Sequence, residues 1–415
     1  MIGAEQLPIA FLAENAHSGS GAPQSAVVAA NACAALGHRA DLVLHRASGS
    51  LLAEVSPEVR VIALDGRPSW SAVRALLGVA GPALFARSLA WRRPADWIYW
   101  SLPELIVYLA SIRPRLLVAF GMKVGSVNGM LARLRPSPAT RHVSAMSIQA
   151  SAWIAQRRRG KRGLVNWYRE CDAIFGCSEG VARDAERTLG LAPSSIFSLF
   201  EPVFDTFEAP SAPPRHRWLA EPGRGAGRTP VIVSAGRLIP RKDYPTLLRA
   251  FARLRAGRPA RLVIFGEGPL ERELTAQARI LGVGDDLDLP GHHADLVREF
   301  AGADLFAFAS RAEGLGKVIV EALAAGLPVA CTDCPSGPRE ILGDGRYGTL
   351  VPVGNAERLA AAMAAELDAP RPRAVQIERA REFSARVFVE RLLGRFDLAQ
   401  PVGPSPPISA IGDLS

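Results

Sequence analysis

Two glutamates, Glu313 and Glu321, have a type and spacing that suit the binding of a polar ligand with hydroxyl groups. Seven residues separate them, and two glycines, Gly314 and Gly316, follow the first glutamate closely. A carboxylate accepts hydrogen bonds from hydroxyl groups, and a glycine-rich turn before a helix binds anions through its amides. Most glutamates are simply solvated on a protein surface, so the pair is informative only together with its surroundings.

The flanking residues predict a strand, a glycine-rich turn and a helix in succession. Residues 304–310 are a short apolar run of strand type, and residues 317–325 are a short helix that ends at Gly326 with Pro328 beyond. Such a turn places the free N–H groups and the positive dipole end of the helix at the carboxyl edge of a sheet. Glu313 then projects from the turn, and Glu321 faces the same crevice from the helix.

A second candidate for anion binding is the loop after residues 231–236, which read VIVSAG and predict a strand. Arg237 and Lys242 lie in this loop, and the next helix begins near Tyr244. Arginine can bind a diphosphate bidentately and lysine acts as a point charge, although two solvated surface cations are the alternative. The following predicted strand, residues 261–266, ends at Gly266.

Elsewhere the chain alternates apolar runs of strand type with helical stretches. Residues 7–13 predict a first buried strand, a loop containing His17, Gly19 and Gly21 follows, and residues 24–36 predict a helix. Further strand-like runs are residues 39–44, 59–64, 115–120, 142–147, 173–178 and 196–200. This alternation predicts an α/β fold with parallel sheets and helices on both faces.

The length of 415 residues suits two domains of ordinary size. We predict a first domain of residues 1–207 and a linker of residues 208–228, where Pro, Gly, Ala and Arg prevail. The second domain covers residues 229–373, one helix covers residues 374–398, and the Pro- and Ser-rich tail of residues 399–415 is expected to be disordered.

The bulk composition narrows the possible partners. The net charge of +9 suits anionic partners, and no nucleic-acid-binding motif is present. The five cysteines include one C-x-x-C pair, Cys331 and Cys334, which lacks the second pair that a zinc site needs. Asp286 and Asp288 have the D-x-D spacing of metal-dependent transferases of another fold, but we interpret them as solvated. We therefore expect no metal, and an odd number of cysteines favours a reduced, cytoplasmic setting.

Two stretches of the first half suggest contact with a membrane surface. Residues 68–100 combine four tryptophans with four arginines, and residues 157–162 read RRRGKR. Aromatic residues beside arginines suit a membrane interface, and a basic patch attracts anionic headgroups. A tryptophan-rich core helix and a solvated loop are the alternative. No apolar run reaches the length that spans a bilayer, so we expect a cytoplasmic protein that associates peripherally with the inner face of the cell membrane.

Residues 310–349 closely resemble the E-x7-E region of the retaining nucleotide-sugar glycosyltransferases of family 4. The resemblance is strong over residues 231–364 and weak in the first half. It implies the GT-B fold, in which two Rossmann-like domains face a cleft and a C-terminal helix crosses back to the first domain. Where the family commonly has G-G-A-E in its acceptor-side loop, this chain lacks the acidic residue.

The same resemblance implies the roles of the candidate residues. Glu313 lies near the donor sugar, Glu321 holds the donor ribose, and Arg237 and Lys242 hold the diphosphate. The remaining donor contacts that it implies are Gly314, Leu315, Gly316, Lys317, Gly266 and His292. The loop that contains His17, Gly19 and Gly21 borders the acceptor.

The implied activity is retaining transfer of a sugar from a nucleotide diphosphate, which we predict to be UDP, to a hydroxyl of a glycan or a lipid-linked acceptor. The partners are then this donor and acceptor together with an anionic membrane surface, and no cofactor is required. Two alternatives remain open, namely a non-catalytic protein that binds nucleotide sugars and a sugar-nucleotide epimerase or hydrolase on the same fold. Product analysis with and without acceptor separates the three.

Overall fold

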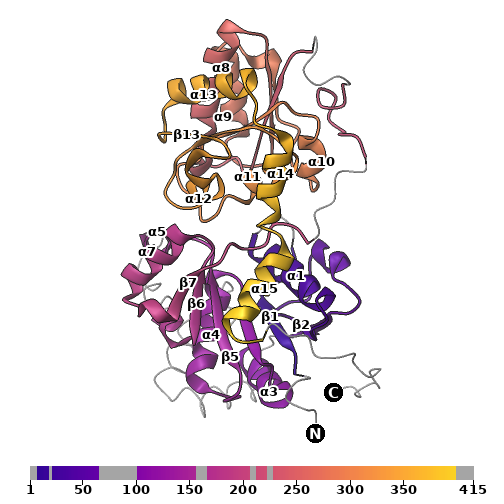
Figure 1. The fold of residues 1–415 in the computed structure, drawn as a ribbon, viewed down its shortest axis with the longest axis vertical. Coiled ribbons are helices and arrows are strands. Elements are labelled where there is room, and N and C mark those ends of the chain that lie inside the picture. Colours follow the sequence, from indigo (N-terminus) through magenta and orange to yellow (C-terminus); the bar gives the residue numbers. More distant parts are fainter. Residues whose placement is uncertain are drawn as a thin grey trace.

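The structure, a computed structural model, describes residues 7–17, 21–64, 101–155, 166–205, 212–221 and 228–398. These residues form two domains, each of which is a parallel sheet covered by helices on both faces (Figure 1). The predicted α/β class is thereby confirmed. The two sheets lie in the first and second halves of the chain, and the C-terminal helices run from the second domain to the first.

The first sheet has the strand order β3-β2-β1-β4-β5-β6-β7, and every neighbouring pair is parallel. Its strands are β1 (Ile9–Ala13), β2 (Ala40–Leu44), β3 (Arg60–Ala63), β4 (Leu116–Ala119), β5 (Arg141–Met146), β6 (Ala173–Gly176) and β7 (Ile196–Ser198). Each lies within or one residue beyond a predicted run. The runs are almost wholly apolar because helices bury both faces of a parallel sheet.

Helices α1 (Gly21–Ala35) and α15 (Ala385–Arg395) cover one face of this sheet, and they pack against each other. The other face carries α3 (Leu102–Ile112), α4 (Met122–Leu134), α5 (Ala150–Ala155) and α7 (Glu179–Leu189). Helix α1 begins three residues earlier than we predicted and includes Pro23. Proline fits there because N–H groups in the first turn of a helix have no intrahelical acceptor, so a residue without an N–H group loses no hydrogen bond.

The second sheet has the order β10-β9-β8-β11-β12-β13, again with all neighbours parallel. Its strands are β8 (Val231–Ala235), β9 (Arg261–Phe265), β10 (Leu287–Asp288), β11 (Leu305–Phe308), β12 (Val329–Thr332) and β13 (Thr349–Val351). Helices α8 (Tyr244–Gly257), α9 (Glu271–Ile280) and α13 (Ala356–Asp368) cover one face. The other face carries α10 (Leu296–Phe300), α11 (Lys317–Ala324), α12 (Pro338–Ile341) and α14 (Arg373–Arg381).

The single helix predicted over residues 374–398 is in fact two helices. Helix α14 packs against α11 in the second domain, whereas α15 packs against α1 in the first. The chain turns between them because Phe383 is buried against Phe200, with ring centroids 4.8 Å apart, and Ser384 caps the N-terminus of α15. The predicted crossing back to the first domain is confirmed, and α15 carries it out.

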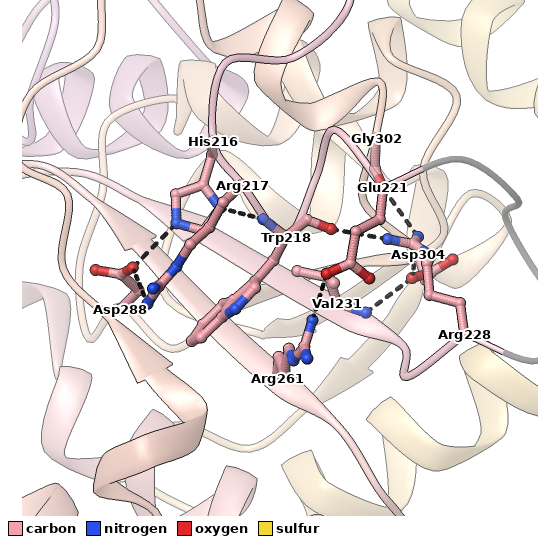
Figure 2. Close-up of polar contacts among 10 residues, drawn as sticks. All are labelled: His216, Arg217, Trp218, Glu221, Arg228, Val231, Arg261, Asp288, Gly302 and Asp304. Carbon is pink, nitrogen blue, oxygen red and sulfur yellow. Dashed lines mark hydrogen bonds and ion pairs between the residues drawn. The ribbon is translucent and has the colours of Figure 1, made fainter.

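The described part of the connection between the domains, residues 212–221, packs against the second sheet rather than extending into solvent. His216 lies 3.2 Å from Asp288, and the Trp218 ring lies between the guanidinium groups of Arg217 and Arg261 (Figure 2). Both His216 and Trp218 are buried. This segment is therefore packed as part of the second domain.

Asp286 and Asp288, which we interpreted as solvated, remain partly exposed, but they also have charged partners. Both are partly buried and form ion pairs, Asp286 with Arg255 at 2.8 Å and Asp288 with Arg217 at 3.3 Å. Their charges balance arginines brought close by the fold, which the D-x-D spacing alone does not indicate. The five cysteines are buried free thiols.

Candidate active site

The candidate site lies where the second sheet reverses its strand order, between β8 and β11. In open parallel sheets, the crevice outside the carboxyl ends of two such strands is the usual place for a nucleotide. The loop after β8 carries Arg237, Arg241 and Lys242, and the loop after β11 carries Glu313. The predicted pairing of these two loops is therefore a consequence of the sheet topology.

Glu313 and Lys242 form the centre of the site. The Lys242 Nζ atom lies 2.7 Å from Glu313 Oε1, and Arg241 lies 3.7 Å from Glu313 Oε2. Both side chains of the closer pair are largely buried, with 12% of Lys242 and 7% of Glu313 exposed. A buried carboxylate needs such compensation, and the two cations also fix the direction in which Glu313 points.

Glu321 lies on α11, in its second turn. The residue is partly exposed, and no described residue donates a hydrogen bond to its carboxylate. Burial raises the pKa of Glu321 to about 7, although the charges of Lys317 and Lys242 act in the opposite direction and Asp295 adds a smaller increase. A carboxylate desolvated in this way favours a ligand that donates hydrogen bonds, such as a vicinal diol.

The N-terminus of α11 presents amides to the same region. Gly316 precedes the helix with a φ of 89°, a left-handed conformation that glycine adopts without strain. The amides of Lys317 and Val318 donate to no acceptor within the described part of the chain, as expected for a first helical turn. They form a partially positive surface of the kind that stabilises phosphate oxygens.

The turn after β11 also touches the first domain directly. A side chain added at Gly314 would place its Cβ only 2.0 Å from the carbonyl oxygen of Ser147. The Ser178 hydroxyl, at the N-terminus of α7, donates to the Gly314 carbonyl at 2.8 Å. Glycine at 314 thus allows the backbone of the turn to lie against the first domain, while Leu315 is buried beside it.

The side chain of Lys317 points across to the first domain. Its Nζ atom donates to the Gly21 carbonyl at 3.1 Å, the Ser25 hydroxyl at 2.5 Å and the Pro202 carbonyl at 3.1 Å. Glu201 lies 3.6 Å from the same nitrogen. The resemblance implied that Lys317 contacts the donor, and here its ammonium group contacts the other domain instead.

The loops after β9 and β10 form the next part of the crevice. The Gly266 amide donates to the Gly291 carbonyl at 2.7 Å, which ties these two loops together. His292 is exposed, and its amide lies 3.4 Å from the Glu267 carboxylate. The main chain at His292 therefore remains a candidate for a base contact, as predicted.

The remaining predicted residues either make few contacts or lie outside the described chain. Arg237 is exposed, and its side chain makes no hydrogen bond or ion pair with the residues that the structure describes. His17 is exposed and lies 3.2 Å from the Ser48 hydroxyl. Gly19 and both stretches predicted to meet a membrane, residues 68–100 and 157–162, lie outside the described residues.

Metal sites, membrane-spanning helices and surface hollows were also sought among the described residues. The described residues include no group of three or more His, Cys, Asp or Glu side chains arranged to hold a metal ion. No described helix is long and apolar enough to cross a bilayer. A surface hollow of about 870 Å³ lies beside Arg253 and Arg258, at the amino edge of the second sheet, so it is remote from the candidate site.

The structure adds residues that the sequence did not indicate. Arg241 joins Lys242 at Glu313, and its position next to a predicted site residue was the only available signal. Glu340 of α12 accepts hydrogen bonds from the amides of Glu179 and Gly180 at the start of α7. Glu201 and Ser25 surround the Lys317 ammonium, and only the folded chain brings them there.

The comparisons with known proteins agree with this geometry. A family model described as glycosyl transferases group 1 matches residues 221–383, which contain the complete second sheet and the candidate site. Over these residues the chain is similar to the group 1 glycosyl transferases. This confirms the predicted resemblance to family 4 over the part of the chain where it was strongest.

Two curated relatives and one solved structure illustrate the match. A Campylobacter jejuni N-acetylgalactosamine-N,N'-diacetylbacillosaminyl-diphospho-undecaprenol 4-alpha-N-acetylgalactosaminyltransferase is 42% identical over 124 residues, or 30% of this chain and 33% of the relative. The lipopolysaccharide core biosynthesis glycosyltransferase LpsE of Rhizobium meliloti is 37% identical over 32% of this chain and 38% of its own length. The matched region thus spans about a third of these relatives.

The whole fold is similar to that of Anabaena Alr3699/HepE, solved in complex with UDP. The TM-score is 0.67 at 17% identity, and the alignment covers 94% of this chain and 100% of the Anabaena chain. At this identity the comparison establishes the fold alone. It confirms the predicted GT-B arrangement of two Rossmann-like domains.

Proposed function

We propose that this protein is a retaining glycosyltransferase that moves a sugar from a nucleotide diphosphate to a hydroxyl group. The observation that carries the proposal is the Lys242–Glu313 pair at the β8/β11 switch point, with the Glu321 carboxylate on the adjoining helix. Cations, free amides and a hydroxyl-binding carboxylate are the groups that a nucleoside diphosphate sugar requires, and here they come from adjacent loops.

The proposed chemistry assigns a task to each group. Charge develops on the diphosphate as the bond to the sugar breaks, and in this proposal Arg237, Lys242 and the α11 amides stabilise it. Glu321 accepts hydrogen bonds from the ribose hydroxyls, and Glu313 orients the sugar. In the front-face mechanism commonly proposed for retaining enzymes of this kind, a diphosphate oxygen takes the acceptor proton. No protein general base is then needed.

The donor and acceptor classes are part of the proposal. UDP is the first nucleotide to test, since Anabaena Alr3699/HepE was solved with UDP. A glycan or lipid-linked acceptor is supported by the names of the relatives, which include the undecaprenol-linked transferase of C. jejuni and the LpsE protein of lipopolysaccharide core biosynthesis. A membrane surface would present such an acceptor, in keeping with the basic and aromatic stretches of the first half.

A panel of UDP-, GDP- and ADP-sugars tests donor binding without any knowledge of the acceptor. A donor at about 100 times its Kd stabilises the folded state by about 2.7 kcal/mol, which raises the unfolding temperature measurably. Glu321→Gln is the matched control, because it preserves shape but removes the charged acceptor. If no nucleotide sugar raises the unfolding temperature, the proposal fails.

Product analysis then separates transfer from the alternatives. With a donor and a panel of lipid-linked and free glycans, we expect a new glycoside with the anomeric configuration of the donor, both with and without a metal chelator. An epimerised donor without acceptor, or binding without any product, would identify the alternative functions. Activity lost with chelator and restored by a divalent ion would refute the metal-free mechanism.

A further inference from the structure

The ammonium group of Lys317 has all of its hydrogen-bonding capacity engaged by the first domain. A lysine ammonium carries three N–H donors, and three acceptors lie within 3.1 Å, namely the Gly21 carbonyl, the Ser25 hydroxyl and the Pro202 carbonyl. In this arrangement no N–H of Lys317 remains for a diphosphate. Its side chain therefore needs an explanation other than donor binding.

The explanation lies in a buried carboxylate of the first domain. Glu201 is only 2% exposed and lies 3.6 Å from the Lys317 nitrogen. The Ser25 hydroxyl donates to Glu201 Oε2 at 2.8 Å, and the Ser147 hydroxyl donates to Oε1. Lys317, Ser25, Glu201 and Ser147 thus form a connected group, which we call the interdomain network.

The interdomain network pairs the negative charge of Glu201, in the first domain, with the positive charge of Lys317, in the second. Glu201 has no other basic partner among the described residues, and a buried carboxylate without a counterion is strongly destabilising. Lys317 is the first residue of α11, so its position also fixes the helix that bears Glu321. Separation of the domains would remove the only described cation from Glu201.

The two domains also approach each other closely on either side of the interdomain network. Gly314 lies against Ser147, and a side chain at Gly180 of α7 would place its Cβ 2.6 Å from Ser336 Cβ. Glu340 accepts the first amides of α7 from across the domain boundary. The turn between Glu313 and Glu321 is therefore held against the first domain on both sides.

We propose that Glu201 is a positioning residue that holds Lys317 across the cleft and thereby fixes the Glu313–Glu321 turn against the acceptor domain during sugar transfer. The proposal rests on the proposed function for its catalytic consequence, but the contact between the domains exists independently of it. Misplacement of reacting groups by about 1 Å can reduce turnover by about 100-fold, so the geometry set by the network matters for kcat.

The first test compares Glu201→Gln, Lys317→Met and the double variant. We expect each single change to lower kcat by about 10-fold or more, and the double variant to match the single ones, because all three remove the same contact. The affinity for UDP, measured by calorimetry, should stay within about 3-fold of the wild type. If Lys317→Met weakens UDP binding by more than about 10-fold and Glu201→Gln does not, Lys317 binds the diphosphate and the proposal is wrong.

The second test does not depend on activity. Small-angle X-ray scattering without donor should give a larger radius of gyration for both single variants than for the wild type. Arg386→Met is the matched control, since it removes an equal charge from an exposed pair with Glu390 inside α15. Unchanged scattering for both variants would overturn the proposal, even if the protein proved to have no transferase activity.

Protein stability is checked separately, because Glu201 is buried. Circular dichroism and thermal unfolding establish whether each variant is folded. Should Glu201→Gln fail to fold, Ser25→Ala replaces it, since this change removes one acceptor of Lys317 without changing a charge. For Ser25→Ala we expect a larger radius of gyration than for the wild type, by less than in Lys317→Met, together with a lower kcat. Wild-type values of both quantities would refute the proposal.

Discussion

The affinity for a nucleotide sugar should depend on pH through the ionisation of Glu321. Burial raises the pKa of this carboxyl group to about 7 in the protein without ligand. Only the ionised form accepts hydrogen bonds from both ribose hydroxyls, so donor binding requires the proton to leave. We therefore expect affinity to rise with pH across the neutral range, whereas an ordinary glutamate would be ionised throughout.

The magnitude follows from the ionised fraction. With a pKa of about 7, roughly a tenth of the protein has Glu321 ionised at pH 6 and roughly nine tenths at pH 8. The apparent Kd is the intrinsic Kd divided by the competent fraction, so it should fall by about 10-fold between these pH values. Lys242 and Lys317 are the cations whose charges lower the pKa of this carboxyl group, against the larger effect of burial.

Isothermal titration calorimetry with a UDP-sugar measures the effect directly. A diphosphate esterified at both ends has no proton to lose in this range, so the ligand itself contributes no pH dependence. Glu321→Gln is the control, and its weaker affinity should be flat between pH 6 and 8. Constant wild-type affinity across this range, or an equal slope in the variant, would refute the assigned role of Glu321.

The same raised pKa predicts a stability effect without ligand. The folded protein binds the Glu321 proton more tightly than the unfolded chain does, so ionisation lowers the free energy of unfolding. This loss is absent below the ordinary pKa near 4.5 and complete above about pH 7. Glu321→Gln should therefore gain stability relative to the wild type as pH rises from 4.5 to 8, and a constant difference would contradict the reasoning.

Three further predictions concern other parts of the site and surface. Lys242→Ala or Arg237→Ala should lower turnover by about 100-fold, as expected when a group that stabilises developing charge is removed, and unchanged kcat would exclude the altered residue from catalysis. Gly314→Ala should lower the free energy of unfolding by about 1–3 kcal/mol, because its Cβ would overlap the Ser147 carbonyl; an unchanged denaturation midpoint would show that the domains do not make this contact. In liposome flotation, anionic vesicles should bind the protein in a salt-sensitive way that weakens when residues 157–159 become Ser, whereas a protein that stays soluble at low salt would favour a soluble acceptor.

The meeting of the two loops in the proposed donor site could be predicted from the sequence because each loop has local signals. Lys242 and Glu313 are 71 residues apart, but each follows a strand of the same parallel sheet directly. The apolar runs identify these strands, and the strand order of a Rossmann-like sheet brings their carboxyl ends together. The glycines of the turn and the start of α11 are equally local signals, so fold and site were inferred from the same residues.

The helix boundaries show where local signals are insufficient. Residues 374–398 have continuous helical character, yet the chain divides into α14 and α15 at Phe383 and Ser384. The division results from packing on two different domains, α14 on α11 and α15 on α1. A segment that must contact two separate cores cannot remain one straight helix, and this requirement is invisible without the partner surfaces.

The interdomain half of the site depends on contacts of much longer range. Lys317 reaches Ser25 across 292 residues, and Glu201 serves as its counterion from the end of the first domain. A lysine at the start of a helix beside two glutamates suggests a phosphate ligand, because pattern and helix dipole agree on that role. In the folded chain, the buried carboxylate of Glu201 competes for Lys317 and has no other cation nearby among the described residues. Leaving this carboxylate without a counterion is costly, so the Lys317 ammonium pairs with Glu201. The role of Lys317 therefore follows from its contact with Glu201 rather than from its own sequence neighbours. Removing the charge at either position should change the surroundings of the other side chain.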